Sequence, residues 1–266
     1  MSEQTANTKR GGVITLTRAI FMREVTLFLR YPVEVAGQLV GFLVMFGIIV
    51  LGGQMIVGDG FSESLEAIIV GYFLWIMSLT AYSNIANEIG MEASWGTLER
   101  LALTPFGFGV IMLVKSIAKL IIAFLTAFLI LLIMLVTTRT TLSIDLVTII
   151  PILVFTIASV FGIGFAVGGF TVLYKNIQSW VMLLQFGFIG LISAPAFEIM
   201  LLEFLPLAKG SEMIQTAMRN GTRLWEFSLT DVTVLVAVGV GYLVVGYGIF
   251  ELCQRRARKL GVLGHY

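Results

Sequence analysis

The chain has 266 residues, of which 58% are hydrophobic and 12% are charged, and its formal net charge is +1. Soluble domains carry about 25% charged residues, so this chain has roughly half of the charge that covers a soluble fold. Together with a mean hydropathy of +0.98, these values exclude an ordinary water-soluble domain and predict an integral membrane protein. The near-neutral charge gives no reason to expect a nucleic-acid partner.

The chain has a single cysteine, Cys253, and a single histidine, His265. One cysteine excludes an internal disulfide, and one histidine at the extreme C-terminus leaves neither a His-rich metal site nor a Ser–His pair within the membrane. We therefore expect no metal, no cofactor and no catalytic residue in this chain. No internal repeat or low-complexity linker divides it, so residues 1–266 are expected to form one domain.

The first predicted element is an amphipathic helix over residues 12–32. The segment ITLTRAIFMREVTLFLRYP, from Ile14 to Pro32, interleaves basic residues with Leu, Ile, Val and Phe. This pattern favours a helix that lies along the inner membrane surface, and Pro32 is expected to end it. The alternative is an ordinary cytoplasmic extension of the first membrane span.

Six apolar windows follow, and each is predicted to be a membrane-spanning helix. A helix needs about 20 apolar residues to cross the hydrocarbon layer, and these windows meet or approach that length without an internal charge. They lack the alternation of a lipid-facing barrel strand, which predicts an all-α fold. The windows are Val35–Val57, Ala67–Asn87, Leu120–Thr138, Leu146–Tyr174, Asn176–Phe197 and Val232–Phe250.

The distribution of Lys and Arg predicts that both termini are cytoplasmic. With the N-terminus inside, thirteen of the seventeen basic residues fall on the cytoplasmic side, as the positive-inside rule prefers. The four on the outer side are Arg139, Lys209, Arg219 and Arg223. The predicted location is therefore the cell membrane, the inner or plasma membrane, with several passes.

The cytoplasmic segment over residues 88–105, between the second and third spans, carries unusually many charges. If NEIGMEASWGTLERLALTP is helical, then Glu88, Glu92, Trp95 and Glu99 fall at about 0°, 40°, 340° and 20° around the axis. Such a stripe of carboxylates suits a surface that faces cations on a partner. Gly90 and Gly96 weaken the helix, and the alternative is a solvated loop whose charges only mark the cytoplasmic side.

Residues 194–231 are too polar to span the membrane and too apolar to form a free loop. Pro195 and Pro206 interrupt the apolar part, so we expect two short helices on the outer side, the first re-entrant into the bilayer. Glu198 and Glu203 lie in this segment and are the predicted residues of an outer gate.

Two glycine-rich runs, FGIGFAVGGF from Phe161 and VGVGYLVVGYG from Val238, lie inside apolar windows. A dinucleotide-binding fingerprint needs a preceding strand and a following acidic residue, and neither run has them. We therefore interpret the glycines as small faces for close helix packing, with Gly164 and Gly168 at GxxxG spacing.

The run E-x3-E-x3-GTLERLALTP resembles the cytoplasmic loop of permease subunits in type-2 ABC exporters. The matching residues are Gly96, Thr97, Leu98, Glu99, Leu101, Thr104 and Pro105. Six spans with both ends inside, an amphipathic N-terminal helix, an outer segment before the last span and the tail RRARKLGVLGHY are also similar to that family. The resemblance covers most of the chain.

The resemblance implies that the loop docks on a separate ATPase subunit. The residues it implies for partner coupling are Glu88, Glu92, Trp95, Gly96, Thr97, Leu98, Glu99, Arg100, Thr104 and Pro105. It further implies two permease chains, alike or different, with two ATPase subunits that hold the ATP and Mg, in contact with membrane lipid. The chain contains no Gly-Lys dipeptide, so it has no Walker A loop and is not expected to be the enzyme.

An ion-gradient-driven secondary transporter is the alternative function. Such a transporter normally places ionisable groups at mid-membrane, and the six windows contain none. The polar residues within the spans are hydroxyls, amides and aromatic groups, which suit an amphipathic or lipid-linked cargo such as a drug, glycolipid or polysaccharide carrier. The alternative is that these polar residues only form hydrogen bonds between helices. The polar residues in question are Gln38, Gln54, Tyr72, Tyr82, Asn84 and Gln185.

Overall fold

The computed structural model describes residues 2–57, 61–94, 108–174, 178–193 and 200–259, and these residues form helices and no strand. The all-α prediction is therefore confirmed for this part of the chain. The α-helices are α1 (Ser2–Arg30), α2 (Pro32–Val57), α3 (Phe61–Ser94), α5 (Phe108–Thr138), α6 (Leu146–Tyr174), α7 (Gln178–Ser193), α8 (Ala208–Asn220) and α9 (Leu229–Lys259), with short 3-10 helices η3 (Met200–Phe204) and η4 (Leu224–Glu226).

Five of the described helices, α2, α3, α5, α6 and α9, are long and apolar enough to cross a membrane. The bounds of α6 match the predicted fourth window, and Pro151 sits in its second turn without ending it. The other four extend beyond their predicted windows. The fifth window, Asn176–Phe197, yields only the 16 residues of α7 in the described part, so a sixth span is not confirmed by length.

The prediction of two short helices in residues 194–231 is neither confirmed nor contradicted, because residues 194–199 lie outside the described residues. In its described part, one helix, α8, stands between the single turns η3 and η4. Helix α3 begins at Phe61, six residues before the second predicted window. A re-entrant path of residues 194–199 lies outside the described residues.

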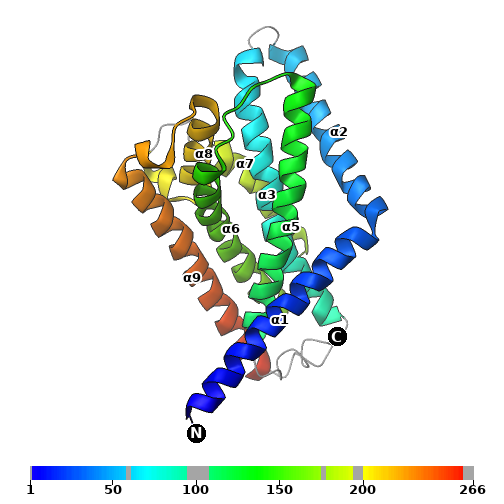
Figure 1. Cartoon of the computed structure of the whole chain (residues 1–266), viewed down its shortest axis with the longest axis vertical. Coiled ribbons are helices and arrows are strands. Elements are labelled where there is room, and N and C mark those ends of the chain that lie inside the picture. Colours follow the sequence, from blue (N-terminus) through cyan, green and yellow to red (C-terminus); the bar gives the residue numbers. More distant parts are fainter. Residues whose placement is uncertain (1, 58–60, 95–107, 175–177, 194–199, 260–266) are drawn as a thin grey trace.

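The N-terminal helix α1 crosses obliquely beside α5 at one end of the bundle (Figure 1). Ile20 of α1 packs against Ile111 and Ala118 of α5, while Arg18 and Arg23 on other faces are exposed. The chain bends at Tyr31, next to the predicted break at Pro32, and α2 starts immediately. The helical prediction for residues 12–32 is confirmed as far as Arg30; their place at a membrane surface stays a prediction.

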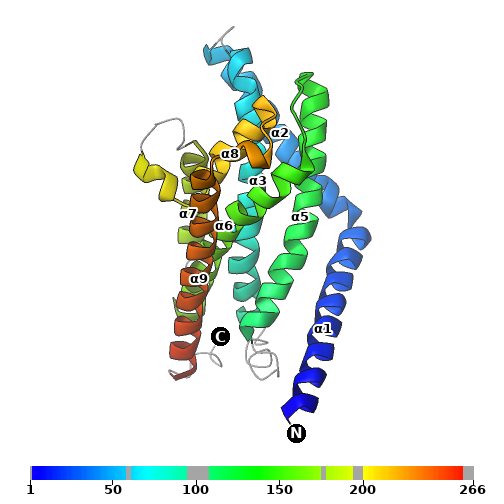
Figure 2. The same cartoon turned by 60° about the vertical axis from the view of Figure 1, so that its left-hand side comes forward.

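Helix α6 is the centre of the bundle, with α3 on one side and α9 on another (Figures 1 and 2). Its backbone meets that of α9 directly. A Cβ atom on Gly246 would lie 1.9 Å from the Gly162 carbonyl oxygen, and one on Gly162 would lie 2.1 Å from the Tyr242 carbonyl oxygen. Further along, a Cβ on Gly239 would lie 2.5 Å from the Phe155 carbonyl oxygen. Only glycine fits at these contacts.

The interpretation of the glycine-rich runs as packing surfaces is confirmed at Gly164, whose Cβ position would be 3.1 Å from the Ile85 side chain of α3. The closest contacts, however, involve Gly162 and Gly246 rather than the predicted pair. The sequence spacing identified the helices that pack but not the glycine that meets the partner backbone.

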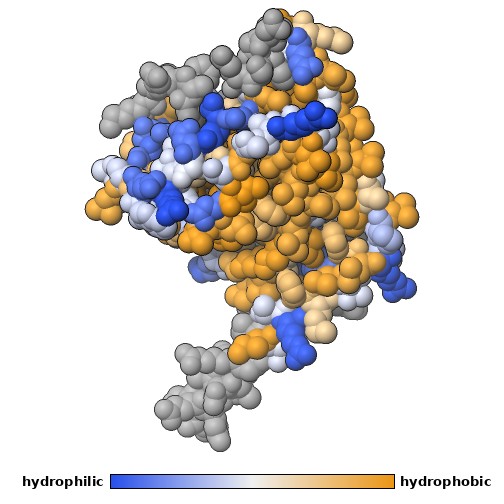
Figure 3. Space-filling model, turned by 45° about the horizontal axis from the view of Figure 1, so that its top comes forward, coloured by the Kyte–Doolittle hydropathy of each residue, from blue (hydrophilic) through white to orange (hydrophobic). Residues whose placement is uncertain are grey.

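The outer surface of the long helices is apolar. In Figure 3, hydrophobic residues cover much of the visible face, and hydrophilic residues gather toward its two ends. Helix α2 shows this most clearly, since Met55 is 86% and Ile56 is 87% exposed. Large apolar side chains exposed along whole helices fit contact with lipid hydrocarbon, as the composition predicts.

The glycine contacts give a first prediction. Gly246→Ala should lower the free energy of unfolding by about 2 kcal/mol or more, because the added methyl group overlaps the α6 backbone. Gly248→Ala is the matched control: a Cβ there meets nothing within 4 Å, so stability should be unchanged or slightly higher. Thermal unfolding of both variants in nanodiscs measures the difference, and equal unfolding temperatures would contradict the α6–α9 contact.

Candidate functional site

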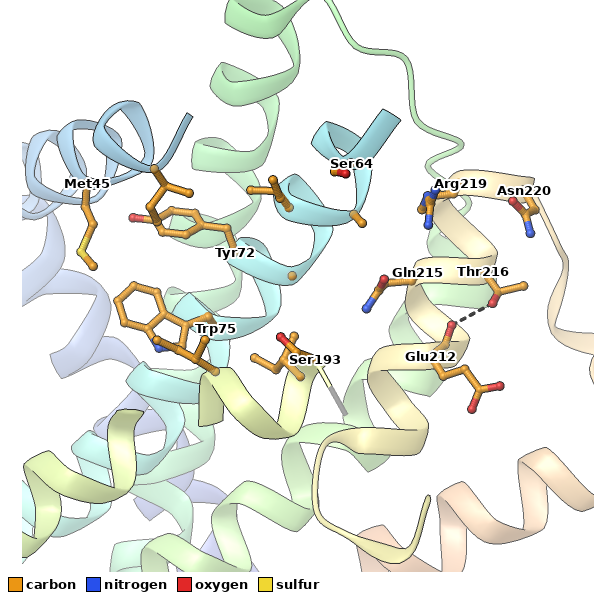
Figure 4. Close-up of a pocket in the computed structure, with 16 residues that line it drawn as sticks. Met45, Ser64, Tyr72, Trp75, Ser193, Glu212, Gln215, Thr216, Arg219 and Asn220 are labelled. Atoms are coloured by element: carbon orange, nitrogen blue, oxygen red, sulfur yellow. Dashed lines mark hydrogen bonds between the residues drawn. The ribbon is translucent and has the colours of Figure 1, made fainter. Parts of the chain in front are cut away.

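A cavity of about 620 Å³ opens between α2, α3, α7 and α8. This volume lies within the range of about 300–1,000 Å³ of small-molecule sites. Figure 4 shows its two unlike walls, with Met45, Tyr72 and Trp75 on one side and residues of α8 on the other. The lining residues are Met45, Ile49, Ser64, Ala67, Ile68, Gly71, Tyr72, Trp75, Ile189, Ile192, Ser193, Glu212, Gln215, Thr216, Arg219 and Asn220.

The apolar wall is organised by Tyr72 of α3. Its hydroxyl donates a 2.6 Å hydrogen bond to the Phe42 carbonyl oxygen, which ties α3 to α2. Its ring centroid lies 5.5 Å from those of Phe46 and Trp75. Because the hydroxyl is engaged, Tyr72 offers the cavity only its ring. The aromatic group is therefore held in place before any ligand arrives.

The polar wall comes from α8, where Ser211, Gln215 and Arg219 follow one another at intervals of four residues and share one helix face. The Gln215 amide donates to the Ser211 hydroxyl at 2.9 Å, and Ser211 donates to the Ile192 carbonyl oxygen of α7 at 2.8 Å. Arg219 Nε lies 3.6 Å from a carboxylate oxygen of Glu66 on α3. The polar wall is thus connected to both α7 and α3.

Helix α8 is held in this position by Lys209, a buried lysine. Its Nζ lies 3.5 Å from Glu203 of η3, 3.0 Å from Glu212 and 2.7 Å from Asp231 of α9. Burial alone would lower the pKa of Lys209, but the hydrogen bonds and charges of Asp231 and Glu212 outweigh it and raise the pKa above its ordinary value. The lysine therefore stays charged and joins three elements.

The opposite end of the bundle holds a second ionic cluster. Glu88, near the end of α3, pairs with Lys115 of α5 at 3.2 Å and with Lys119, also of α5. The Glu88 side chain is 16% exposed. Burial disfavours its charged form, yet the two lysines outweigh burial and hold the pKa of Glu88 below its ordinary value. This cluster joins α3, which precedes residues 95–107, to α5, which follows them.

The predicted site residues fall into three groups. Glu88 faces the lysines of α5, and Glu203 lies 3.5 Å from Lys209; the role of Glu203 in an outer gate stays a prediction. Glu92 lies within α3, which continues to Ser94, so the helical prediction holds for that part of the segment. The remaining predicted residues lie outside the described residues: Trp95, Gly96, Thr97, Leu98, Glu99, Arg100, Thr104, Pro105 and Glu198.

Sequence reasoning named Tyr72 but missed Trp75 and the polar face of α8. The spacing of Ser211, Gln215 and Arg219 was a usable signal for that face, since polar residues four apart predict one helical stripe. No comparable signal pointed to Trp75. Within the described ranges, no group of three or more His, Cys, Asp or Glu residues is placed to hold a metal ion.

Comparison of this chain with family models, curated proteins and solved structures finds no match. A functional assignment therefore depends on the chain's own residues and their geometry.

The Glu88 cluster gives the second prediction. Glu88→Gln should lower the free energy of unfolding by about 2 kcal/mol at neutral pH, because it leaves two lysines without their shared carboxylate. The matched control is Glu251→Gln, which removes a 2.6 Å pair with exposed Arg255 on α9 and should cost less than about 0.5 kcal/mol. Thermal unfolding in nanodiscs measures both.

The same pair of variants tests the pH dependence. A carboxylate with a lowered folded-state pKa stabilises the fold above its unfolded-state pKa of about 4.3, and this contribution is lost as pH falls through the folded-state value. The difference in unfolding free energy between wild type and Glu88→Gln should therefore have its full size at pH 7 and shrink below about pH 4. A difference that is constant between pH 7 and pH 3.5 would contradict the ionic clamp.

Proposed function

We propose that this chain is the permease subunit of an ATP-driven exporter of the type-2 ABC class. Two copies, or one copy and a second permease, form the substrate path, and two separate ATPase subunits supply the energy. The observation that carries the proposal is the run GTLERLALTP, which resembles the coupling loop of that family and lies between α3 and α5. The resemblance, rather than a matched relative, supports the assignment.

The geometry around that run supports a coupling role. Glu88 joins α3 to α5 through Lys115 and Lys119, so the two helices that flank residues 95–107 are held together near the ends that face this segment. A displacement of the segment by a partner would therefore move both helices together. Since α3 also carries Gly71, Tyr72 and Trp75, such a movement would reach the cavity wall. Rigid-body shifts of packed helices are a usual form of such transmission.

The proposed topology has six spans, with α7 as the fifth in chain order and both termini cytoplasmic. Helix α7 has 16 residues and a length of about 24 Å, which is close to the roughly 30 Å hydrocarbon layer. Figure 2 supports this arrangement, because the N-terminal end of α1 and the C-terminal end of α9 lie toward the same end of the bundle.

The cavity supports an amphipathic cargo. Its wall of Met45, Ile49 and Trp75 suits an apolar chain, and its wall of Gln215 and Arg219 suits a polar head. Amphipathic or lipid-linked compounds combine both parts.

The coupling role is tested by reversing charges in the segment. Glu92→Lys with Glu99→Lys should abolish co-purification of an ATPase subunit that carries a Walker A loop, because a desolvated interface charge contributes about 2–5 kcal/mol. The permease itself should stay folded. The measurement is the ATPase content and ATP hydrolysis of the purified complex.

The control for that experiment is Glu251→Lys, which reverses an exposed charge near the end of α9. It should keep the ATPase bound, since exposed pairs are worth about 0–1 kcal/mol. Normal ATPase binding and hydrolysis in the double variant would overturn the coupling role of Glu92 and Glu99. Absence of any ATPase from the unaltered permease would favour the secondary transporter.

The orientation is tested by labelling single cysteines in a Cys253→Ala background. Thr141 and Lys259 are exposed residues near opposite ends of the bundle. Thr141→Cys should react with an impermeant thiol reagent on intact cells, whereas Lys259→Cys should react only after permeabilisation. The reverse pattern would contradict cytoplasmic termini.

A further inference from the structure

Three buried polar atoms on α3 have no hydrogen-bond partner within the described chain. They are Trp75 Nε1, Ser78 Oγ and Tyr82 Oη. Ser78 and Tyr82 are fully buried. An unpaired polar atom in a protein interior costs free energy, and the cost is higher where water is excluded by a bilayer. Three such atoms on one helix therefore need an explanation.

Other buried hydroxyls in the long helices are satisfied locally. Thr126 donates to the Ile122 carbonyl oxygen at 2.9 Å, and Thr156 donates to that of Ile152 at 2.6 Å. Ser116 donates in the same way to Met112 at 2.8 Å. A bond to the carbonyl one turn earlier is the ordinary solution for a serine or threonine in an apolar helix. Ser78 does not use it, so its hydroxyl is free for another partner.

The residues that carry the three unpaired atoms lie on one face of α3, and Gly71 and Tyr82 of that face contact α7. At 100° per residue, Gly71, Trp75, Ser78 and Tyr82 fall within an arc of about 60°. A Cβ on Gly71 would lie 3.6 Å from Ile192 of α7, and the Tyr82 ring lies edge-on to Phe188 of α7 at 5.2 Å between centroids. We call this contact, from Gly71 to Tyr82 on α3 and from Phe188 to Ile192 on α7, the α3–α7 seam.

The seam is continuous with the cavity, because Gly71, Trp75, Ile189 and Ile192 belong to both. The Gln215–Ser211–Ile192 hydrogen bonds tie the polar cavity wall to the outer end of α7. On its other side, α7 exposes Trp180, Met182, Leu183 and Phe186. A shift of α7 away from α3 would move these side chains within hydrocarbon, and the Ser211–Ile192 hydrogen bond would limit the shift at the end of α7 that contacts α8.

We propose that the α3–α7 seam is the binding site for the oxygen-bearing middle of an amphiphile whose head occupies the polar wall of the cavity. The ligand is a single amphipathic molecule that carries ester, ether or hydroxyl oxygens along an otherwise apolar chain. When α7 shifts, Trp75 Nε1 donates to the first of these oxygens, and the hydroxyls of Ser78 and Tyr82 bond to the next ones. That this ligand is the transported cargo rests on the proposed function; that it binds does not.

The first test is the stability of the ligand-free chain. Ser78→Ala and Tyr82→Phe delete unpaired hydroxyls and keep the shape of each side chain, so the unfolding temperature should be unchanged or rise by roughly 2–4 °C. A hydroxyl with a structural partner would give a lower unfolding temperature when it is removed. A fall in either variant overturns the proposal, whatever its effect on binding.

The second test measures binding to the permease alone in phosphatidylcholine nanodiscs. Trp95→Phe, Trp180→Phe and Trp225→Phe leave Trp75 as the single fluorescent tryptophan. The probes are methyl 5-bromododecanoate, which carries its bromine near an ester, and 5-bromododecane, which lacks the ester; bromine quenches a nearby indole. The ester should quench Trp75 saturably, and the alkane should quench it only in proportion to its concentration in the bilayer.

In this background Ser78→Ala and Tyr82→Phe should each weaken the ester about three- to tenfold, as expected for one lost hydrogen bond. The matched control is Ser83→Ala, whose position lies about 80° from Trp75 and outside the seam. It should bind the ester like the parent. Absence of saturable quenching, or equal binding of ester and alkane in all variants, overturns the proposal. No ATPase is present in this binding assay, so failure of the coupling test does not affect its result. Failure of the binding assay likewise leaves the coupling test unaffected.

Discussion

The direct backbone contact between α6 and α9 is the constraint on which the rest of the fold depends. Gly162 and Gly246 leave no room for a side chain between the two helices, so α9 lies flush against α6 along most of its length. In a bilayer, helices gain little from burying apolar surface, and close packing through glycine is a main source of association. The pair therefore forms a rigid core to which other elements attach.

Helix α8 is placed by the same core. A Cβ on Gly210 would lie 1.9 Å from the Thr156 hydroxyl of α6, which again allows only glycine. The Ser143 amide donates to the Met218 carbonyl oxygen at 2.8 Å, and Lys209 bonds Asp231 of α9. Because these contacts seat α8 on α6 and α9, the face with Gln215 and Arg219 turns toward α3 and closes the cavity.

Helix α3 connects the two ends of the molecule. Near one end Glu88 pairs with Lys115, and near the other Glu66 meets Arg219 of α8. Between them Trp75 forms part of the cavity wall. A helix that is charged at both ends and carries unpaired donors in the middle is suited to couple movements of the segment between α3 and α5 to the cavity. Glu66 and Glu88 are held by partners, whereas the buried hydroxyls of Ser78 and Tyr82 are left unpaired within the described chain.

The sequence by itself determined the all-α class, the apolar helices and their order. A window of about 20 apolar residues is long enough to cross the bilayer, and a helix is the structure in which such a segment satisfies its own backbone hydrogen bonds. It also indicated the helix before Pro32 and glycine packing in α6 and α9. Only the tertiary structure decided that Glu88 faces Lys115, that Gly162 meets the backbone of α9, and that Trp75 and Arg219 line one cavity. Helical periodicity places a residue on a face, but the partner of that face depends on contacts between segments far apart in the chain.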